Sequence, residues 1–494
     1  MNYKRFIAAA ACLCMTAPMT ANCLPSIGTA AEGTAVIGDV NNDGALAVAD
    51  LVMFQRWLGG AGELTAWGNA DYSQDGSVDI FDFCLMRKAL NPANNPPAES
   101  QTVNLCQGVI PESVTGSAAD EEFILGQTKF YLSLMQETVK SEEAGTNILI
   151  SPYSVMQALA MTANGADGET KTEMESVLGG MSMDRLNEYL YTQRKSYDNE
   201  QNSLLSTANS IWIRDDDDRI TVLPEFLQTN KSYYDADAFM APFDETTVTD
   251  INDWVSKETY EMIPEIIDKI DDDIVMYLIN AIGFDAEWAE QYTKADVYEC
   301  DFTAYDGTVQ QAEMMGSDDC LYLEDDNAVG VYKYYKGRKY AFAAIMPNEG
   351  ISLDDYIAGL TPESLNEILT NPKGASLISG IPKFKYEYNT TMNDSLEAMG
   401  MPRAFTPSAD FTRMAKTKSG YLYIDFVLHK TFIELSEYGT MAGAVTAVGM
   451  TEECMKVIDK EVILDRPFLY CIVDTETDLP IFMGTLSQIP GSVE

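Results

Sequence analysis

Two acidic loops with the same twelve-residue pattern constrain the first part of this 494-residue chain more than any other feature. The first begins at Asp39 and the second at Asp71, and a glycine stands sixth in each, at Gly44 and Gly76, where such a loop must turn sharply. Oxygen atoms at alternate positions can surround a hard cation that needs six to eight oxygen ligands. The repeat therefore predicts two bound calcium ions, and a pair of metal-free acidic turns is the alternative. The expected ligands are Asp39, Asn41, Asp43, Ala45 and Asp50 in the first loop and Asp71, Ser73, Asp75, Ser77, Asp79 and Asp82 in the second.

An apolar helix is expected after each loop, over 51–58 and 83–90, and none before the first loop. Aspartate takes the twelfth position of both loops, where standard EF-hands have glutamate. This small all-α arrangement resembles a type I dockerin, a module that anchors secreted proteins to cohesins on cellulosome scaffolds. The resemblance implies that a cohesin of a scaffoldin contacts the tenth and eleventh loop positions and basic residues on the helices. These residues are Val48, Ala49, Ile80, Phe81, Arg56, Arg87 and Lys88.

Residues 1–31 have the composition of a secretion signal. Lys4 and Arg5 precede a short apolar stretch over 6–17, which is too short to span a bilayer as a helix. We therefore expect an exported, extracellular protein without a transmembrane anchor, associated with a cellulosome or cell surface. Lipidation at Cys23 is left open.

Charge and residue usage exclude several classes of function. Lys and Arg number 32 against 77 Asp and Glu, and the net charge of −45 repels nucleic-acid phosphates and anionic membranes. His429 is the only histidine, which excludes multi-histidine metal sites and leaves one residue for any Ser-His-Asp triad. The nine cysteines form no CxxC spacing, and pairing of Cys300 with Cys320 is left open.

Three zones follow the signal. Residues 36–92 contain the repeat, and residues 93–117, which begin with several prolines, are expected to be a stiff linker. Residues 118–494 contain no second linker, and helical patterns alternate there with strand-like runs. This part is expected to be one large domain of mixed α and β structure.

A stretch near the C-terminus has the composition of a strand that can enter a sheet. Residues 439–449 carry no charge and no proline. With a period of two, one face consists of Thr440, Ala442, Ala444, Thr446 and Val448, small or β-branched side chains that fit beneath a sheet. Taken alone, the stretch could equally be a surface loop or an ordinary buried strand.

This stretch, together with four others, resembles the serpin family of serine protease inhibitors. The other four are 147–155, 208–212, 278–288 and 462–472. Shorter matches at 251–255, 314–315, 381–384 and 404–411 lie between them in the expected order, and the resemblance spans 118–494. It implies an α+β fold with a large central β-sheet, further sheets, about nine helices and an exposed reactive-centre loop. It also implies a monomeric suicide inhibitor, not an enzyme, which traps a serine or cysteine protease as a covalent acyl-enzyme. A non-inhibitory serpin that acts as a binding or scaffold component is the alternative.

The resemblance assigns roles to particular residues and leaves no catalytic residue. Counting from Gly439 as in typical serpins places the reactive bond between Glu453 and Cys454, with Met450, Met455 and Lys456 left open. The hinge of the reactive loop is Glu437, Gly439, Thr440, Ala442 and Ala444, and the structural residues that gate the central sheet are Ser151, Ser154, Asn280, Trp288 and His429. A glycosidase, the common kind of dockerin-bearing protein, is disfavoured because serpin motifs fill the whole large domain.

Overall fold

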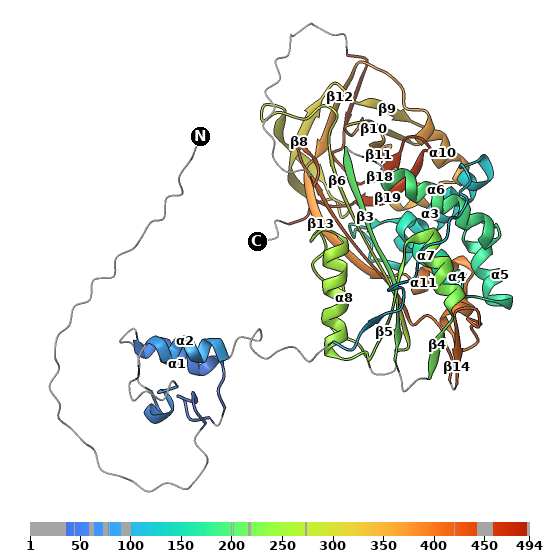
Figure 1. Ribbon diagram of the computed structural model, residues 1–494. Coiled ribbons are helices and arrows are strands. Elements are labelled where there is room, and N and C mark those ends of the chain that lie inside the picture. Colours follow the sequence, from blue (N-terminus) through green and yellow to red (C-terminus); the bar gives the residue numbers. More distant parts are fainter. Residues whose placement is uncertain are drawn as a thin grey trace, which may run out of the picture. The chain divides into compact units, whose positions relative to one another are not determined.

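The computed structural model describes residues 36–43, 45–58, 64–72, 78, 80–89, 100–198, 200, 202–215, 219–271, 274–418, 420–441 and 458–491. The chain divides into two compact units, Met1–Pro97 and Ala98–Glu494. Each unit has its own hydrophobic core. Figure 1 shows the helices and strands of both units.

The first unit is built on two helices, α1 (Val48–Leu58) and α2 (Ile80–Ala89), with a short 3-10 turn, η1 (Trp67–Asn69). Its buried core consists of Val40, Phe54, Ala70 and Met86. The ring of Phe54 meets that of Phe83 edge to face at 6.0 Å, which joins the two helices. The predicted small helical module is therefore present.

A seven-stranded central sheet organises the second unit, with the strand order β1-β5-β3-β6-β16-β15-β13 among the described residues. Most neighbours are antiparallel, but β3 runs parallel to β5, and β6 runs parallel to β15. Its strands are β1 (Val103–Asn104), β3 (Ser203–Arg214), β5 (Asp237–Ala241), β6 (Met276–Glu287), β13 (Phe384–Thr391), β15 (Phe426–Leu435) and β16 (Gly439–Thr440).

Two further sheets and a ribbon complete the β structure that is described. The six-stranded sheet contains β2 (Leu149–Ile150), β19 (Leu479–Leu486), β18 (Phe468–Asp474), β11 (Tyr340–Pro347), β10 (Ala328–Tyr334) and β9 (Leu321–Glu324), in that order. The four-stranded sheet contains β17 (Lys460–Ile463), β12 (Leu377–Pro382), β8 (Val309–Ser317) and β7 (Val297–Thr303). The ribbon pairs β14 (Ala415–Thr417) with β4 (Ile220–Val222).

Nine α-helices are described in the second unit, in agreement with the prediction of about nine. They are α3 (Glu121–Ser141), α4 (Pro152–Ala163), α5 (Gly168–Val177), α6 (Met183–Asp198), α7 (Pro224–Tyr234), α8 (Glu245–Glu258), α9 (Leu353–Gly359), α10 (Pro362–Thr370) and α11 (Asn393–Met399). A 3-10 turn, η3 (Pro402–Phe405), follows α11.

Helices cover both faces of the central sheet, with α8 on one side and α4 on the other (Figure 1). Side chains of β6 alternate between the two faces, as a strand requires. Tyr277 and Ile279 pack in the core under α8, whereas Leu278 and Ile282 pack in the larger core that contains α4. The centre of this sheet is consequently closed to solvent.

Residues 100–117, predicted to be part of the linker, belong instead to the second unit. β1 pairs with the outer edge of β5, where Val103 lies opposite Met240, and the N–H of Leu105 donates to the carbonyl of Ala238. The side chain of Cys106 is only 3% exposed. The backbone N–H and C=O groups at the edge of β5 find hydrogen-bond partners in this segment. The prolines and glycines of the segment gave no sign that it would form a strand.

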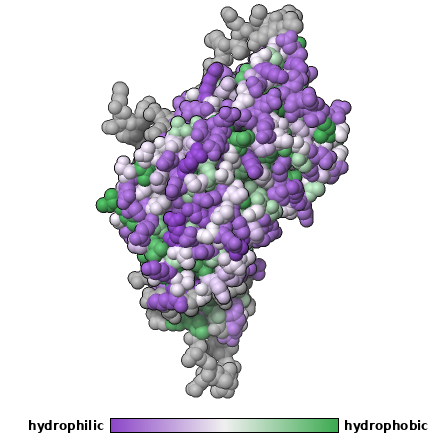
Figure 2. Space-filling model, turned by 90° about the vertical axis from the view of Figure 1, so that its right-hand side faces the viewer, coloured by the Kyte–Doolittle hydropathy of each residue, from purple (hydrophilic) through white to green (hydrophobic). Residues whose placement is uncertain are grey.

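Hydrophilic side chains predominate on the face of the protein drawn in Figure 2, where hydrophobic ones are scattered. This agrees with an acidic composition of 77 Asp and Glu. Within the described part of the chain, no helix combines the length and apolar character that crossing a membrane requires.

Candidate functional site

A row of polar side chains crosses the middle of the central sheet. Asn209 of β3 lies opposite Asn280 of β6, and Asn280 lies opposite His429 of β15. Asn280 and His429 are fully buried. Ser151 and Ser154, at the start of α4, meet this row from the larger core and are also fully buried.

Hydrogen bonds join these five residues into one network. The Nε2 atom of His429 accepts the backbone N–H of Ser151 at 3.0 Å, which leaves the ring proton on Nδ1 to be donated to Oδ1 of Asn280. The side-chain amide of Asn280 donates to Ser154 Oγ and to Asn209 Oδ1. Ser154 Oγ donates in turn to Asn209 Oδ1 at 3.1 Å. The network ties β3, β6 and β15 to α4.

The ring of His429 is held neutral at this place. Complete burial lowers its pKa from 6.5 to about 3, although the bond to Asn280 acts in the opposite direction. A neutral imidazole supplies both the acceptor for Ser151 and the donor for Asn280. Both ring nitrogens are therefore engaged, and among the described residues no hydroxyl donates its proton to the ring. The hydroxyl of Ser151 donates instead to the carbonyl of Ile481 at 2.8 Å.

Two residues of the predicted hinge lie between the strands at one end of the sheet. Gly439 and Thr440 form β16, which pairs antiparallel with β15 on one side and with β6 on the other. Gly439 has a φ of +154°, and a Cβ placed there would lie 2.0 Å from the carbonyl oxygen of Ala286. Only glycine fits this position. Thr440 is 1% exposed, and its hydroxyl meets that of Tyr335 at 2.5 Å.

Trp288 belongs to the hinge and not to the histidine network. Its indole N–H donates to the carbonyl of Ser436 at 2.9 Å, and its backbone N–H donates to the carbonyl of Tyr438 at 2.9 Å. Its ring stacks on Tyr335 with centroids 4.5 Å apart, and Tyr335 in turn bonds Thr440. Trp288 therefore fixes the chain on both sides of the tight turn that leads into β16.

An ion pair secures the approach to the hinge. Lys383 lies 3.0 Å from the carboxylate of Glu437 and 3.4 Å from that of Glu313. Partial burial acts to raise the pKa of Glu437, but hydrogen bonds from its own backbone and from Lys383 outweigh burial and lower it. The carboxylate of Glu437 is thus held in its charged form.

The pairing of β6 with β15 changes along the sheet. From Tyr277 opposite Phe426 to Ile282 opposite Thr431, the two strands are direct parallel neighbours. Beyond this stretch β16 stands between them and is antiparallel to both. Residues 442–457 lie outside the described part of the chain, so Ala442, Ala444 and the predicted reactive bond between Glu453 and Cys454 have no described position.

In the first unit, the first acidic loop gathers three carboxylates. Asp39, Asp43 and Asp50 place oxygens within 4.8 Å of one another, and Asp39 and Asp50 are nearly fully buried. Asp50 accepts the backbone N–H groups of Val40, Asn41 and Ala47, which fixes the curl of the loop. Three converging carboxylates repel one another unless a cation lies between them, so this arrangement suits calcium, with Asn41 and Ala45 in the same loop.

The second loop is described only in part. Asp71 and Asp82 are placed, and Asp82 is 1% exposed, whereas Ser73, Asp75, Ser77 and Asp79 lie outside the described residues. The predicted cohesin contacts Val48, Ile80, Phe81 and Lys88 lie in α1 and α2, and Ala49, Arg56 and Arg87 are exposed on the same two helices.

Three partners in these sites had not been predicted: Asn209, Tyr335 and Lys383. Asn209 and Lys383 lie within stretches that resemble serpin motifs, so the sequence contained a signal by which these two partners could have been found. Tyr335 has none, because its contact with Thr440 joins residues that are 105 positions apart. Cys300 and Cys320, whose pairing was left open, are both free thiols.

The central sheet and the short hinge strand are those of the serpin fold, and comparisons with known proteins agree. The serpin (serine protease inhibitor) family profile matches residues 125–489, and the dockerin type I domain profile matches residues 37–91. The chain belongs to the serpin family and carries a dockerin type I domain, a kind of domain that generally binds calcium.

Particular relatives are similar over the second unit. An uncharacterized serpin-like protein of Thermococcus kodakarensis is 30% identical, and the match covers 69% of this chain and 80% of that protein. The leukocyte elastase inhibitor of Sus scrofa is 28% identical, and the match covers 74% of this chain and 100% of that protein. The crystal structure of the thermophilic serpin tengpin in its native state is 45% identical, with a TM-score of 0.75 over 79% of this chain and all of that one. Its latent state gives a TM-score of 0.66 over 77% of this chain and all of that one, so the arrangement here is nearer to the native state.

Proposed function

We propose that this protein is a secreted suicide inhibitor of a serine or cysteine protease, anchored through its dockerin to a cohesin of a scaffoldin. The observation that carries the inhibitory part is the position of β16. Gly439 and Thr440 already lie between β6 and β15 and are antiparallel to both. A longer strand in the same place would extend both antiparallel pairings, the one with β6 and the one with β15.

The exchange of pairings favours insertion. The parallel contact between β6 and β15 covers six residue pairs, from Tyr277 with Phe426 to Ile282 with Thr431. An inserted strand would replace it with two antiparallel ladders. About a dozen new backbone hydrogen bonds at about 1 kcal/mol each give a driving force of order 10 kcal/mol, comparable to the whole stability of many proteases.

The chemistry of trapping belongs to the protease. Its nucleophile attacks the carbonyl carbon of the reactive bond, the peptide C–N bond breaks, and the new amino terminus leaves with the proton, which gives an acyl-enzyme. The reactive loop, cut at this bond, is then free to move into the sheet and carries the acylated protease with it. Distortion of the protease before water attacks the ester or thioester would leave the complex covalent.

The polar network around His429 would gate this movement. Separation of β6 from β15 breaks the bond between His429 and Asn280, which lie opposite each other. Because every member of this buried network has partners, opening it exposes polar groups that lose them. The closed sheet would therefore be kinetically trapped until the loop is cut.

The dockerin would determine where inhibition takes place. The first loop would hold calcium through Asp39, Asn41, Asp43, Ala45 and Asp50, and the second would hold another ion through its matching positions. Calcium there would offset the repulsion among Asp39, Asp43 and Asp50, next to α1, and α1 and α2 carry the predicted cohesin contacts. Inhibition would then protect neighbouring proteins on the same extracellular scaffold from proteolysis.

Incubation of the mature protein with a panel of serine and cysteine proteases tests the inhibitory proposal. We expect one or more proteases to give a covalent complex that survives denaturing electrophoresis. The mass of the released C-terminal peptide should locate the reactive bond between Glu453 and Cys454. Cleavage by every protease without any complex would favour the alternative, a non-inhibitory serpin that acts as a binding or scaffold component.

A further inference from the structure

β3 has a backbone edge that is uncovered over its first half. On one side β3 pairs with β6 throughout, from Ser203 opposite Ala286 onward. On the other side β5 begins only at Asp237, opposite Ser210. Among the described residues, 203–209 therefore have a strand neighbour on one side only.

The hydrogen bonds at the other end of β3 show which residues face this open edge. The N–H of Arg214 donates to the carbonyl of Val275, just before β6, and the N–H of Asp215 donates to the carbonyl of Ala241 in β5. Backbone groups of successive residues alternate in direction along a strand. Even-numbered residues of β3 therefore bond toward β6, and odd-numbered residues point toward the side of β5.

Leu205 and Thr207 are odd-numbered and lie where β5 is absent. Their two N–H groups and two carbonyls point to the open edge, and none of the four has a hydrogen-bond partner within the part of the chain that is described. Buried or half-buried backbone groups are rarely left without partners. This row of alternating donors and acceptors has the pattern that an added strand satisfies.

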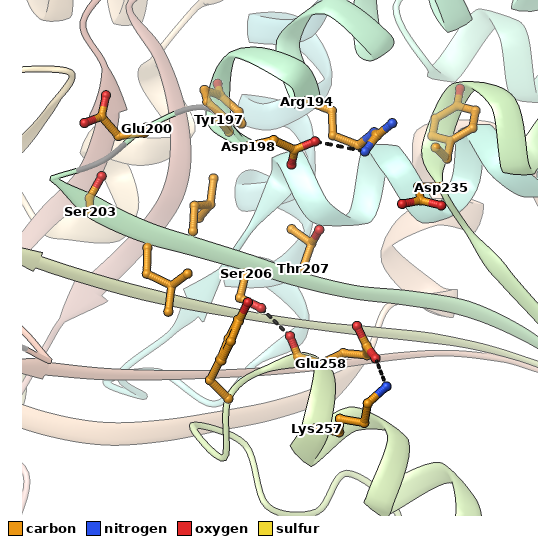
Figure 3. Close-up of a pocket in the computed structure, with 14 residues that line it drawn as sticks. Arg194, Tyr197, Asp198, Glu200, Ser203, Ser206, Thr207, Asp235, Lys257 and Glu258 are labelled. Carbon is orange, nitrogen blue, oxygen red and sulfur yellow. Dashed lines mark hydrogen bonds and ion pairs between the residues drawn. The ribbon is translucent and has the colours of Figure 1, made fainter. Parts of the chain in front are cut away.

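A cavity of about 740 Å³ lies along this edge, with residues 203–207 of β3 on its floor (Figure 3). A narrower recess of about 70 Å³ shares Thr207 with it and reaches Gln157 of α4. Gln157 is 3% exposed, and its side-chain Nε2 has no hydrogen-bond partner among the described residues. The hydroxyl of Ser203, also in the cavity lining, is likewise buried without a partner.

The walls of the cavity carry more acid than base. In Figure 3, Arg194 and Asp198 of α6 form an ion pair at 3.1 Å above β3, and Lys257 and Glu258 of α8 form one at 2.8 Å below it. Glu200 and Asp235 also line the cavity, so four carboxylates face two basic groups.

We propose that this groove binds an extended segment of a partner protein that carries lysine or arginine and adds as a short strand to β3 at Leu205 and Thr207. The alternating backbone groups require a peptide, because a small organic cation would satisfy the carboxylates and leave the strand edge unpaired. The excess of carboxylates favours basic side chains on that peptide. This site lies on β3, apart from the hinge and from the pairing of β6 with β15, and it does not depend on inhibitory activity.

The test uses the full-length chain and an acetylated, amidated pentapeptide of alternating lysine and valine. Hydrogen–deuterium exchange followed by mass spectrometry should show slower exchange in the segment that contains 203–209 and little change elsewhere. Two control peptides have glutamate in place of lysine or N-methyl groups on alternate backbone nitrogens, and neither should protect this segment. Equal protection by the N-methylated peptide, or protection confined to another region, would overturn the proposal, as would no protection at millimolar peptide.

A variant of the chain tests the strand edge itself. Leu205→Pro removes an N–H that points into the cavity but no hydrogen bond to β6, and proline is tolerated at such an edge. We expect about fivefold weaker binding of the lysine peptide by calorimetry, the equivalent of one backbone hydrogen bond. Glu258→Gln should also weaken binding, and Glu299→Gln on β7 is the distant control. If the proline variant fails to fold, the comparison of the N-methylated peptide with the unmodified one tests whether the strand edge is used. Unchanged affinity in a folded Leu205→Pro variant would contradict the proposal.

Discussion

His429 of β15 and Asn280 of β6 lie directly opposite each other, joined by a hydrogen bond between Nδ1 and Oδ1 at a fully buried place in the central sheet. These are the two strands that an inserting reactive loop must separate. The acceptor Nε2 of the same ring ties β15 to Ser151 at the start of α4. One neutral imidazole therefore joins β15 both to β6 and to the start of α4.

Acid should weaken the native state through His429. Burial lowers the pKa of the ring to about 3, whereas in the unfolded chain the ring protonates near pH 6.5. The unfolded state therefore binds the extra proton first, and stability falls as pH decreases from 6.5 to 3. We expect this residue to contribute a loss of about 3–5 kcal/mol in the free energy of unfolding over that range.

A comparison with His429→Gln isolates this contribution from that of the carboxylates. Glutamine stays neutral, so the difference in free energy of unfolding between the two proteins, measured in urea, should change between pH 6.5 and 3. Because the chain has one histidine, its imidazole NMR signals are also assigned without ambiguity. A ring that titrates near pH 6.5 in the folded protein, or a pH-independent difference, would rule this account out.

Loss of the charge on Glu437 should loosen the hinge. Glu437→Gln removes the ion pair with Lys383, whose partners are 17% and 25% exposed, and we expect a cost of about 1–2 kcal/mol in urea unfolding. Glu434→Gln is a matched control nearby, because Lys385 of β13 and Glu434 of β15 are also 3.0 Å apart but 57% and 44% exposed. That change should cost less than about 0.5 kcal/mol. Equal costs for the two variants would show that burial does not strengthen the hinge pair.

A side chain at Gly439 should expel β16 from between its neighbours. In Gly439→Ala the new Cβ meets the carbonyl oxygen of Ala286 at 2.0 Å, so the pairing of Thr440 is lost and stability falls by about 2 kcal/mol or more. Gly359→Ala is the control, since nothing lies within 4 Å of a Cβ there. Urea unfolding measures both variants, and backbone exchange at Thr440 reports whether the hinge has left the sheet. An alanine variant as stable as the native protein, with Thr440 still protected, would contradict the close packing of the hinge.

Removal of calcium should unfold the first unit and leave the second intact. Without an ion, the converging carboxylates of Asp39, Asp43 and Asp50 repel one another, and α1 and α2 lose their anchor. We expect chelation to reduce helical circular dichroism and to change the fluorescence of Trp57 and Trp67, whose rings are 5.0 Å apart. Calcium should restore both signals and magnesium should not. Signals that are insensitive to chelation would argue for metal-free turns.

Sequence patterns predicted the fold better than the partners of particular side chains. The motifs around Ser151 and Asn280, and the place of His429 ahead of the hinge, each mark a single element, and the fold then brings the three residues together in one buried network. Trp288, which the resemblance also names as a residue that gates the sheet, lies at the hinge, where its indole bonds Ser436, 148 positions away. A contact of that range depends on where β6 ends against the turn before β16, which no local pattern encodes.

The edge of the sheet was harder to predict for a similar reason. Residues 100–117 have few apolar positions, so composition alone favoured a linker. The finding that β1 covers β5 depends on backbone hydrogen bonds, which almost any sequence can make at an open edge. The uncovered edge at Leu205 and Thr207 follows from the short length of β5, which also could not be predicted from side-chain patterns.

The central claim, that the cut loop replaces the parallel contact of β6 with β15 by two antiparallel ladders, is tested most directly by the melting temperature before and after proteolysis of the loop. With cleavage within 442–457 verified by mass spectrometry, a gain of order 10 kcal/mol predicts a melting temperature higher by about 20 °C. Backbone exchange in β6 and β15 should slow at the same time. An unchanged melting temperature in the fully cleaved protein would contradict insertion and would leave docking as the proposed activity.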